Sequence, residues 1–159
     1  LTAAVIEGDI AGSIDAERIG ALGVSVVQIN TDGACHLDAS MIASATKELD
    51  LGKVDLLLIE NVGNLVCTAG FDLGEHWRIV LLSVSEGDDK IVKYPAIFQG
   101  ADALVITKID LLPYVNFNIQ KATTDMKRLA PSARVFVVAA TKGEGIPALA
   151  EWVSSRLRH

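Results

Sequence analysis

The chain of 159 residues is long enough to bury the core of a single domain, and half of its residues are hydrophobic, which excludes an intrinsically disordered protein. Its net charge of −6 gives no reason to expect nucleic-acid binding, and no apolar run approaches the roughly 20 residues of a membrane span. Two cysteines are too few for a disulfide framework, so we expect reduced thiols in a cytoplasmic protein.

Apolar runs of strand length recur along the chain, at residues 2–7, 24–29, 54–60, 77–84, 101–107 and 134–139. Most are continuously apolar, as expected for parallel strands that are covered on both faces. Helical patterns lie between them, at 15–22 after a possible N-cap at Ser13, and at 38–49, 117–129 and 146–157. This alternation predicts a doubly wound, mostly parallel α/β sheet with residues 1–159 as one domain. In such sheets, ligands bind at the carboxyl ends of strands.

The predicted strand ends carry polar residues, among them Glu7-Gly8-Asp9 and Glu60-Asn61-Val62-Gly63. Glu60 followed by Gly63 fits a turn of the Walker B kind. There a carboxylate holds Mg²⁺, and the glycine N–H approaches a terminal phosphate because no Cβ stands in the way. An acidic strand end before a tight turn is the alternative interpretation of the same residues.

The segment Thr107-Lys108-Ile109-Asp110 is similar to the Asn-Lys-x-Asp motif of guanine-binding GTPases. In that motif the aspartate accepts two hydrogen bonds from guanine that adenine cannot supply, which gives the base selectivity. Thr107 stands where asparagine is usual. The later Ala140-Thr141-Lys142 turn resembles the Ser-Ala-Lys loop, whose backbone N–H meets the guanine carbonyl. The alternative interpretation is that Thr107–Asp110 only connect a strand to the following loop and bind no nucleotide.

The stretch TDGACHLDAS, residues 31–40, places Cys35 next to His36. Thiolate and imidazole are suitable ligands for Zn²⁺ and Ni²⁺. A small buried thiol beside a polar loop residue is the competing interpretation, because a lone cysteine often behaves as a small hydrophobe. His76 and the terminal His159 are not expected to be ligands.

The sequence contains no G-x-x-x-x-G-K-[ST] motif, which in P-loop proteins binds the phosphates and Mg²⁺. It also starts without methionine, so we expect a longer gene product whose N-terminal P-loop segment is absent from this chain. We therefore predict weak or no GTP binding by these 159 residues in isothermal titration calorimetry. Submicromolar affinity would contradict this prediction.

Long strings of the sequence together resemble the hydrogenase nickel-incorporation GTPase family, HypB. They are VIEGDI, DAERI, LLLIENVGNLVC, FDLGE, LLSVSEGDDK, KYP and KIDLLPYV, with GACHLDA after the second predicted strand. The resemblance covers nearly the whole chain. It implies a P-loop NTPase fold of the signal-recognition and MinD-like GTPase class, with the first strand and P-loop missing here. It also implies GTP-dependent delivery of nickel during [NiFe]-hydrogenase maturation.

The resemblance assigns roles to matching residues. Near Mg²⁺ and the γ-phosphate of GTP it places Asp9, Glu60 and Gly63. At the guanine base it places Thr107, Lys108, Asp110, Ala140 and Thr141. As ligands of Ni²⁺ or Zn²⁺ at a homodimer interface it places Cys35, His36 and Cys67. The implied partners are a small nickel- and zinc-binding maturation protein and the hydrogenase large subunit. Asp32, Thr68 and Thr107 depart from the usual glycine, proline and asparagine.

Other functions remain open on this sequence. A non-catalytic fragment that binds metal and dimerises is favoured by the missing P-loop. A phospho-acceptor receiver domain would need an aspartate at the carboxyl end of its central strand. Here Asp55 stands at the start of the third predicted strand, and its end is Glu60. The acidic segment 86–90 has no derived role and is interpreted as a solvated turn.

Overall fold

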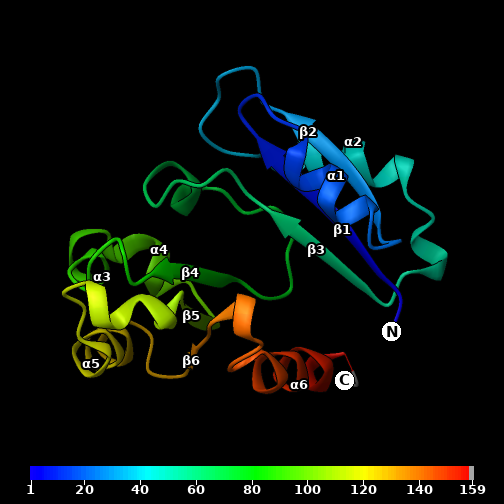
Figure 1. Cartoon of the computed structure of the whole chain (residues 1–159). Helices are drawn as coiled ribbons and strands as arrows, with labels where there is room; N and C mark the ends of the chain where they lie inside the picture. The colour runs from blue at the N-terminus through cyan, green and yellow to red at the C-terminus, as the bar shows by residue number, and fades with distance from the viewer. Residues whose placement is uncertain (158–159) are drawn as a thin grey trace. The chain divides into compact units, whose positions relative to one another are not determined.

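The computed structural model describes residues 1–157, which divide after Glu75 into two compact units. Each unit has its own three-stranded sheet, and all the strands are parallel (Figure 1). The predicted α/β class with mostly parallel strands is confirmed. The assignment of residues 1–159 to one domain stays a prediction, and His159 lies outside the described residues.

The sheet of the first unit has the order β2-β1-β3, so the earliest strand lies in the middle. The strands are β1 (Ala3–Asp9), β2 (Ser25–Asn30) and β3 (Leu56–Glu60). Their register places Glu7 of β1 opposite both Gln28 of β2 and Glu60 of β3. Because side chains directly opposite one another point to the same face, these three polar residues form a row near the carboxyl ends of the strands.

Helices cover both faces of this sheet. Helix α1 (Ile14–Gly20) lies over the face of Val26, whose side chain is 3.7 Å from a Cβ built on Gly20. Helix α2 (Ala39–Ala45) packs on the opposite face, where its Ile42 shares a core with Val27. Adjacent residues of a strand point to opposite faces, so β2 is covered on both sides, as its continuous apolar run predicts.

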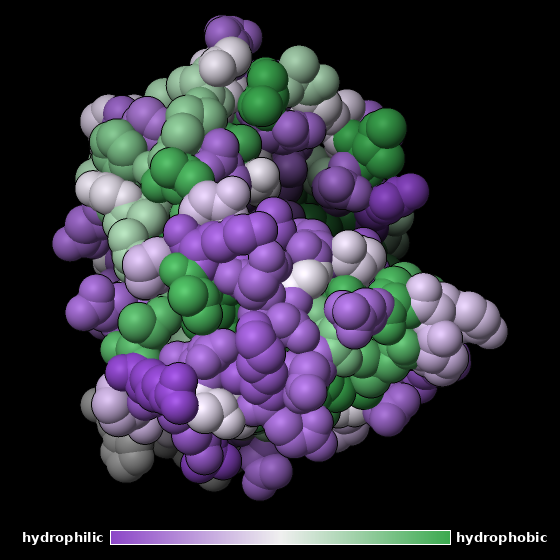
Figure 2. All heavy atoms as spheres, turned by 90° about the vertical axis from the view of Figure 1, so that its left-hand side faces the viewer, coloured by the Kyte–Doolittle hydropathy of each residue, from purple (hydrophilic) through white to green (hydrophobic). Residues whose placement is uncertain are grey.

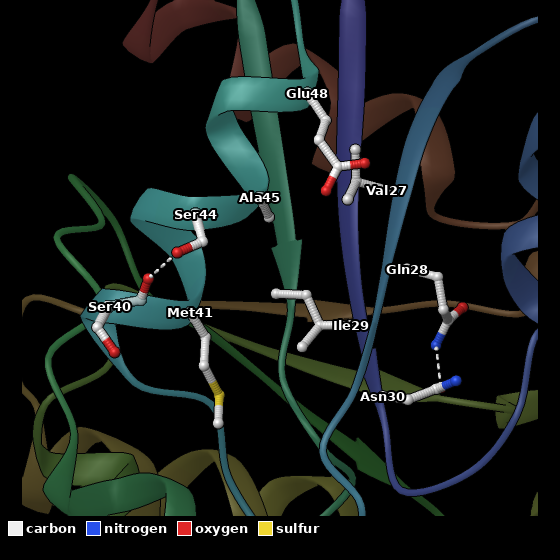
Figure 3. A pocket seen from close by; sticks show the side chains of 9 residues that line it. All are labelled: Val27, Gln28, Ile29, Asn30, Ser40, Met41, Ser44, Ala45 and Glu48. Carbon is white, nitrogen blue, oxygen red and sulfur yellow. Dashed lines mark hydrogen bonds between the residues drawn. The ribbon is translucent and has the colours of Figure 1, made fainter.

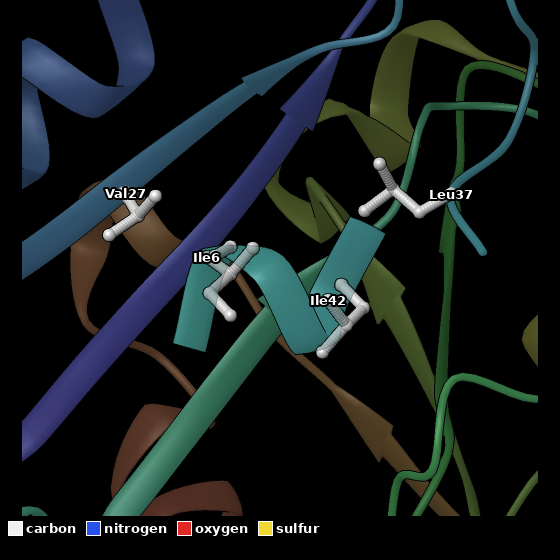
Figure 4. Packing of buried hydrophobic residues seen from close by; sticks show 5 residues of the cluster. Ile6, Val27, Leu37 and Ile42 are labelled. Carbon is white, nitrogen blue, oxygen red and sulfur yellow. The ribbon is translucent and has the colours of Figure 1, made fainter. Parts of the chain in front are cut away.

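The core of the first unit lies between the sheet and α2 (Figure 4). Its buried members are Ile6, Val27, Leu37, Ile42 and Ala45. Leu37 comes from the loop before α2 and is fully buried. A Cβ built on Gly8 would lie 2.6 Å from its Cδ1 atom, so the leucine sits directly against the glycine backbone.

The second unit has the sheet order β4-β5-β6 with four helices. Its fully buried core includes Phe98, Leu104, Ile106 and Met126. The ring of Trp152 in the last helix packs against Phe136 of the last strand, 5.6 Å between centroids. The strands are β4 (Ile79–Ser83), β5 (Ala103–Thr107) and β6 (Arg134–Val137). The helices are α3 (Lys90–Lys93), α4 (Pro95–Gln99), α5 (Ile119–Leu129) and α6 (Ile146–Arg156).

Several predicted helix details change in the structure. The helix predicted at 38–49 is α-helical only to Ala45 and continues as a 3-10 turn, Thr46–Glu48. Asp38 caps it, since its Oδ1 accepts a hydrogen bond from the Met41 N–H at 2.9 Å. Ser13 does precede α1, but its hydroxyl donates to Glu17 instead of capping the helix. The unpredicted α3 and α4 are too short to show a helical period.

The acidic turn after β4 is an anchor and not simply solvated. Asp88 accepts hydrogen bonds from the Asn118 N–H and from the Lys121 ammonium, each at 2.8 Å, and thereby holds the start of α5. The hydrogen bond from Lys121, followed by that from Asn118, lowers the pKa of Asp88. Its neighbour Asp89 instead makes an exposed ion pair with Lys93 one helical turn along.

We expect Asp88→Ala to lower the free energy of unfolding by about 1–2 kcal/mol, because the Asn118 N–H loses its acceptor and Lys121 loses its nearer carboxylate, with only Asp125 left at 3.5 Å. Asp89→Ala is the matched control and should change the free energy of unfolding much less, because solvent screens its exposed ion pair with Lys93. Urea unfolding followed by tryptophan fluorescence measures this, since both tryptophans, Trp77 and Trp152, belong to the second unit. Equal losses in the two variants would contradict the anchoring role.

Hydrophilic residues cover much of the face shown in Figure 2, with hydrophobic side chains in separate patches between them. Over residues 1–157, no helix combines the length and the apolar character needed to cross a membrane.

Candidate functional site

Two loops of the first unit bring the predicted metal ligands together. Cys35 and His36 lie in the loop between β2 and α2, and the Cys35 Sγ is 3.9 Å from the His36 Nδ1. Cys67 begins a 3-10 turn (Cys67–Gly70) in the loop after β3. A hydrogen bond with the Cys35 thiol, together with burial, raises the pKa of Cys67, so the two cysteines of the two loops lie near each other. All three side chains are half-buried.

The sequence did not point to Phe71, which lies four residues after Cys67. Its ring stacks on the His36 imidazole, with 3.6 Å between centroids and 14° between planes. The stack restricts the orientation of the imidazole and therefore the direction in which its nitrogens can meet a metal ion.

Adjacent residues of a regular strand point to opposite faces, and the turn before Cys35 explains how Cys35 and His36 can nevertheless lie near each other. Asp32 and Gly33 both have positive φ, 51° and 102°, and the Thr31 hydroxyl closes the turn by donating to the Ala34 carbonyl at 2.6 Å. Among L-residues, aspartate and asparagine tolerate this left-handed conformation best. Asp32 therefore fits a position where the resembling family usually has glycine.

Within residues 1–157, no group of three or more histidine, cysteine, aspartate or glutamate side chains is arranged to hold a metal ion by itself. Cys35, His36 and Cys67 are neighbours in space, yet one chain does not close a tetrahedral site. A metal ion with these ligands would need further ligands from elsewhere.

Carboxylates gather on one face of the first sheet, at its carboxyl edge. Asp9 ends β1, Glu60 ends β3, and Glu7 stands opposite Glu60. Glu7 is only 5% exposed, and its Oε2 atom has no hydrogen-bond partner. Burial raises the pKa of Glu7, and the Glu60 and Asp9 carboxylates raise it further, against a hydrogen bond with Gln28 that lowers it. An unpartnered buried oxygen beside two further carboxylates fits the oxygen ligands that Mg²⁺ prefers.

The raised pKa predicts how Glu7 affects stability. A carboxyl group whose folded-state pKa is raised stabilises the fold below its unfolded pKa, and this contribution is lost as the pH rises through the folded pKa. Glu7→Gln should therefore remove this pH dependence and stabilise the first unit at pH 7 by about 1–3 kcal/mol, since a buried charge without full hydrogen bonding is costly. Hydrogen exchange of the β1 amides at pH 4 and pH 7 measures the effect. Protection that is lower in the variant at pH 7 would contradict it.

Gly63 lies exposed in the loop after β3, and a Cβ built on it meets no atom within 4 Å. Its backbone is therefore open to a ligand, as the predicted phosphate contact requires.

The predicted guanine-binding residues lie in the second unit, at the ends of neighbouring strands. Thr107 ends β5, and Lys108 follows it in the left-handed conformation with φ 59°. Asp110 lies half-buried in the 3-10 turn that comes next, Ile109–Tyr114. Ala140 and Thr141 are exposed in the turn after β6, and the Ile109 N–H donates to the Val138 carbonyl at 3.2 Å, which links the two strand ends.

An open groove of about 400 Å³ lies elsewhere in the first unit, between the edge strand β2 and helix α2 (Figure 3). It is lined by Val27, Gln28, Ile29, Asn30, Ser40, Met41, Ser44, Ala45 and Glu48. None of the predicted site residues lies in it.

Comparison with known proteins shows to which family the chain belongs. The model of the CobW/HypB/UreG nucleotide-binding domain matches residues 1–137. The chain belongs to the CobW/HypB/UreG family. The hydrogenase maturation factor HypB of Escherichia coli K12 is 46% identical over 153 residues, which are 96% of this chain and 53% of that protein. The probable HypB of Methanocaldococcus jannaschii is 45% identical over 155 residues, 98% of this chain and 70% of that protein. The chain thus spans about half the length of the first of these relatives.

Two solved structures from the CobW/HypB/UreG family have the same fold. HypB from Helicobacter pylori in complex with nickel matches with a TM-score of 0.95 and 42% identity, over 99% of this chain and 75% of that one. HypB from Archaeoglobus fulgidus matches with a TM-score of 0.90 and 38% identity, over 99% and 76%. The predicted HypB family and α/β P-loop fold are confirmed, whereas the absence of the first strand and P-loop stays a prediction. The roles of individual site residues stay predictions.

Proposed function

We propose that the chain is the metal-binding part of a GTP-dependent metallochaperone that delivers nickel during [NiFe]-hydrogenase maturation. The observation that carries this proposal is that Cys67 lies near Cys35, 32 residues earlier in the chain, and that the Cys35 Sγ is 3.9 Å from the His36 Nδ1. The relatives are named hydrogenase maturation factors, and the H. pylori structure is described as a complex with nickel. Both support the proposal.

The transported ion is Ni²⁺, and Zn²⁺ is chemically acceptable to the same ligands. Cys35, His36 and Cys67 provide three ligands, one short of a tetrahedral site. A two-fold axis through the site would supply the same residues from a second copy, so we propose a cytoplasmic homodimer joined at this site. The metal would arrive from a small nickel- and zinc-binding partner and leave for the hydrogenase large subunit.

We further propose that GTP and Mg²⁺ are bound by two groups of residues at the carboxyl ends of strands. Asp9 and Glu60 would hold Mg²⁺, directly or through water, and orient the attacking water, and the open backbone of Gly63 would contact the γ-phosphate. Mg²⁺ supplies charge neutralisation on the phosphates when it is bound. In the second unit, Asp110 with Lys108 would recognise guanine, together with Thr107 and the exposed Ala140 and Thr141 backbone.

A second candidate function is a non-catalytic fragment that binds metal and dimerises. The absence of a G-x-x-x-x-G-K-[ST] motif from the sequence favours it, because that motif supplies the phosphate-binding lysine and the Mg²⁺ hydroxyl. Nickel binding that proceeds without nucleotide, in a chain that hydrolyses no GTP, is the result expected for this candidate.

Nickel titration tests the proposed site. The reduced protein is titrated with Ni²⁺ while the thiolate-to-nickel charge-transfer absorbance is followed, and light scattering measures the mass. Cys35→Ala and Cys67→Ala should abolish the charge-transfer band and the metal-dependent dimer, whereas His76→Ala, a histidine of the second unit, should change neither. Because thiols must lose protons to bind, affinity should rise with pH. Unchanged stoichiometric binding in both cysteine variants would refute the site.

A further inference from the structure

One side chain joins the two loops that carry the candidate metal ligands. The Oδ1 atom of Asn61 accepts a hydrogen bond from the Leu37 N–H at 2.9 Å and another from the Val62 N–H at 2.9 Å. Leu37 directly follows His36, and Asn61 begins the loop that leads to Cys67. The amide therefore ties the Cys35-His36 loop to the loop after β3 across 24 residues of sequence.

The segment between Asn61 and Cys67 is held by its own hydrogen bonds. The Asn64 side chain accepts from the Val66 and Cys67 N–H groups at 2.8 and 2.9 Å. The hydroxyl of the buried Thr68 donates to the Asn64 carbonyl. These contacts fix Cys67 relative to Asn64, three residues along the chain from Asn61.

The other loop is held at its end by Leu37. Its side chain is fully buried against Gly8 and the core, and the next residue, Asp38, caps α2. The Leu37 N–H thus sits at a fixed point of the fold, one residue from His36 and two from Cys35. This N–H donates to Asn61 of the opposite loop, so the two loops are joined one residue from His36.

We propose that Asn61 is a positioning residue that holds Cys35 and His36 at the correct distance from Cys67 and thereby sets the metal affinity of the site. Asn61 binds no metal in this proposal, because its Oδ1 is already engaged by two backbone N–H groups. The inference rests on the proposed metal-binding function and adds the residue that organises the ligands. Groups that orient metal ligands from outside the coordination sphere typically change metal affinity about 10- to 100-fold when they are removed.

The experiment compares wild type with Asn61→Ala, Asn61→Asp and Asn118→Ala. Alanine removes the acceptor, and aspartate retains it at the same place. Asn118→Ala is the matched control, since the Asn118 Oδ1 also accepts one backbone N–H, from Lys121 at 2.9 Å, but in the second unit. Thermal unfolding by circular dichroism shows that each variant is folded. If Asn61→Ala does not unfold cooperatively, Asn61→Ser replaces it, because its shorter side chain does not reach Leu37.

The first measurement needs no metal ion. Phenylarsine oxide forms two As–S bonds with two neighbouring thiols and releases water. The rate at which this bridged adduct forms, followed by intact mass spectrometry, therefore reports the spacing of Cys35 and Cys67. The second measurement is Ni²⁺ affinity from the charge-transfer band. We expect slower bridging and about 10- to 100-fold weaker Ni²⁺ binding in Asn61→Ala. The Asn61→Asp and Asn118→Ala variants should resemble wild type in both.

The outcomes separate this inference from the proposed function. If Asn61→Ala bridges and binds nickel as wild type does, the positioning role is wrong and the proposed site stands. If wild type shows no cysteine-dependent nickel band, the proposed function is wrong, and the arsenical rates alone decide whether Asn61 sets the thiol spacing. Equal losses in Asn61→Ala and Asn118→Ala would also overturn the inference, since the effect would then be general loss of stability.

Discussion

Replacing Gly145 by alanine is expected to destabilise the second unit far more than the same change at Gly143. Both glycines have a left-handed backbone, with φ 73° and 68°, which costs an L-residue roughly 1–2 kcal/mol. Around Gly143 a Cβ meets no atom within 4 Å, whereas at Gly145 it would collide with the Val137 carbonyl oxygen and lie 3.1 Å from Val138 Cγ1. A collision with backbone cannot be relieved by a rotamer change.

The Gly143→Ala variant should therefore lose about 1–2 kcal/mol of unfolding free energy, and Gly145→Ala about 2–5 kcal/mol, as the overpacking adds to the backbone cost. Urea unfolding followed by the fluorescence of Trp77 and Trp152 measures both. Both glycines follow the turn proposed to contact guanine, Ala140–Lys142, so the result also shows whether the chain next to this turn can be altered without unfolding the second unit. Equal losses in the two variants would show that the collision is relieved by movement of the chain.

Leu37→Ala is the substitution expected to affect the first unit most. Leu37 is fully buried among Ile6, Val27 and Ile42, and truncation of such a leucine typically costs about 2–5 kcal/mol. Leu22→Ala is the control, because Leu22 is 81% exposed and its change should stay within about 0.5 kcal/mol. The first unit holds no tryptophan or tyrosine, so hydrogen exchange at the β1 amides provides the measurement.

The contact between Leu37 and Gly8 can be tested separately with a double variant. Gly8→Ala alone places a methyl group 2.6 Å from the Leu37 Cδ1 and should overpack the core by about 1–3 kcal/mol. Combined with Leu37→Ala, the added methyl group finds space, so the double variant should be less destabilised than the sum of the single ones. Strict additivity would mean that the two residues do not pack against each other.

The sequence predicted the strands well, because buried parallel strands are continuous apolar runs. The structure shifts most of their ends, as at β1, which extends to Asp9 beyond the predicted end at Glu7. This shift explains why Glu7 is buried: it lies inside the strand and not at its rim. The division of the strands between two sheets was not predictable, since an apolar run does not specify its neighbours.

Only those residues of the candidate site whose type by itself indicates metal binding could be predicted from the sequence. Cys35, His36 and Cys67 stand out as possible ligands in any sequence. Asn61 and Phe71 do not, because their partners, Leu37 and His36, are 24 and 35 residues away and no local pattern connects them. Asn64 had a local signal, an asparagine three residues before Cys67 at the start of a turn, which is typical of side chains that cap backbone N–H groups.

The central position of β1 in its sheet has a consequence for how the protein is made. This strand leaves the ribosome first of the three, yet it pairs with β2 from Ser25 and with β3 from Leu56. During synthesis, more than 50 further residues must therefore be added before both β2 and β3 are available to pair with β1. Pairing across such sequence separations is slow. In that interval the hydrophobic run of β1 is open to chaperones or to a second nascent chain, which makes it the segment where misassembly would begin.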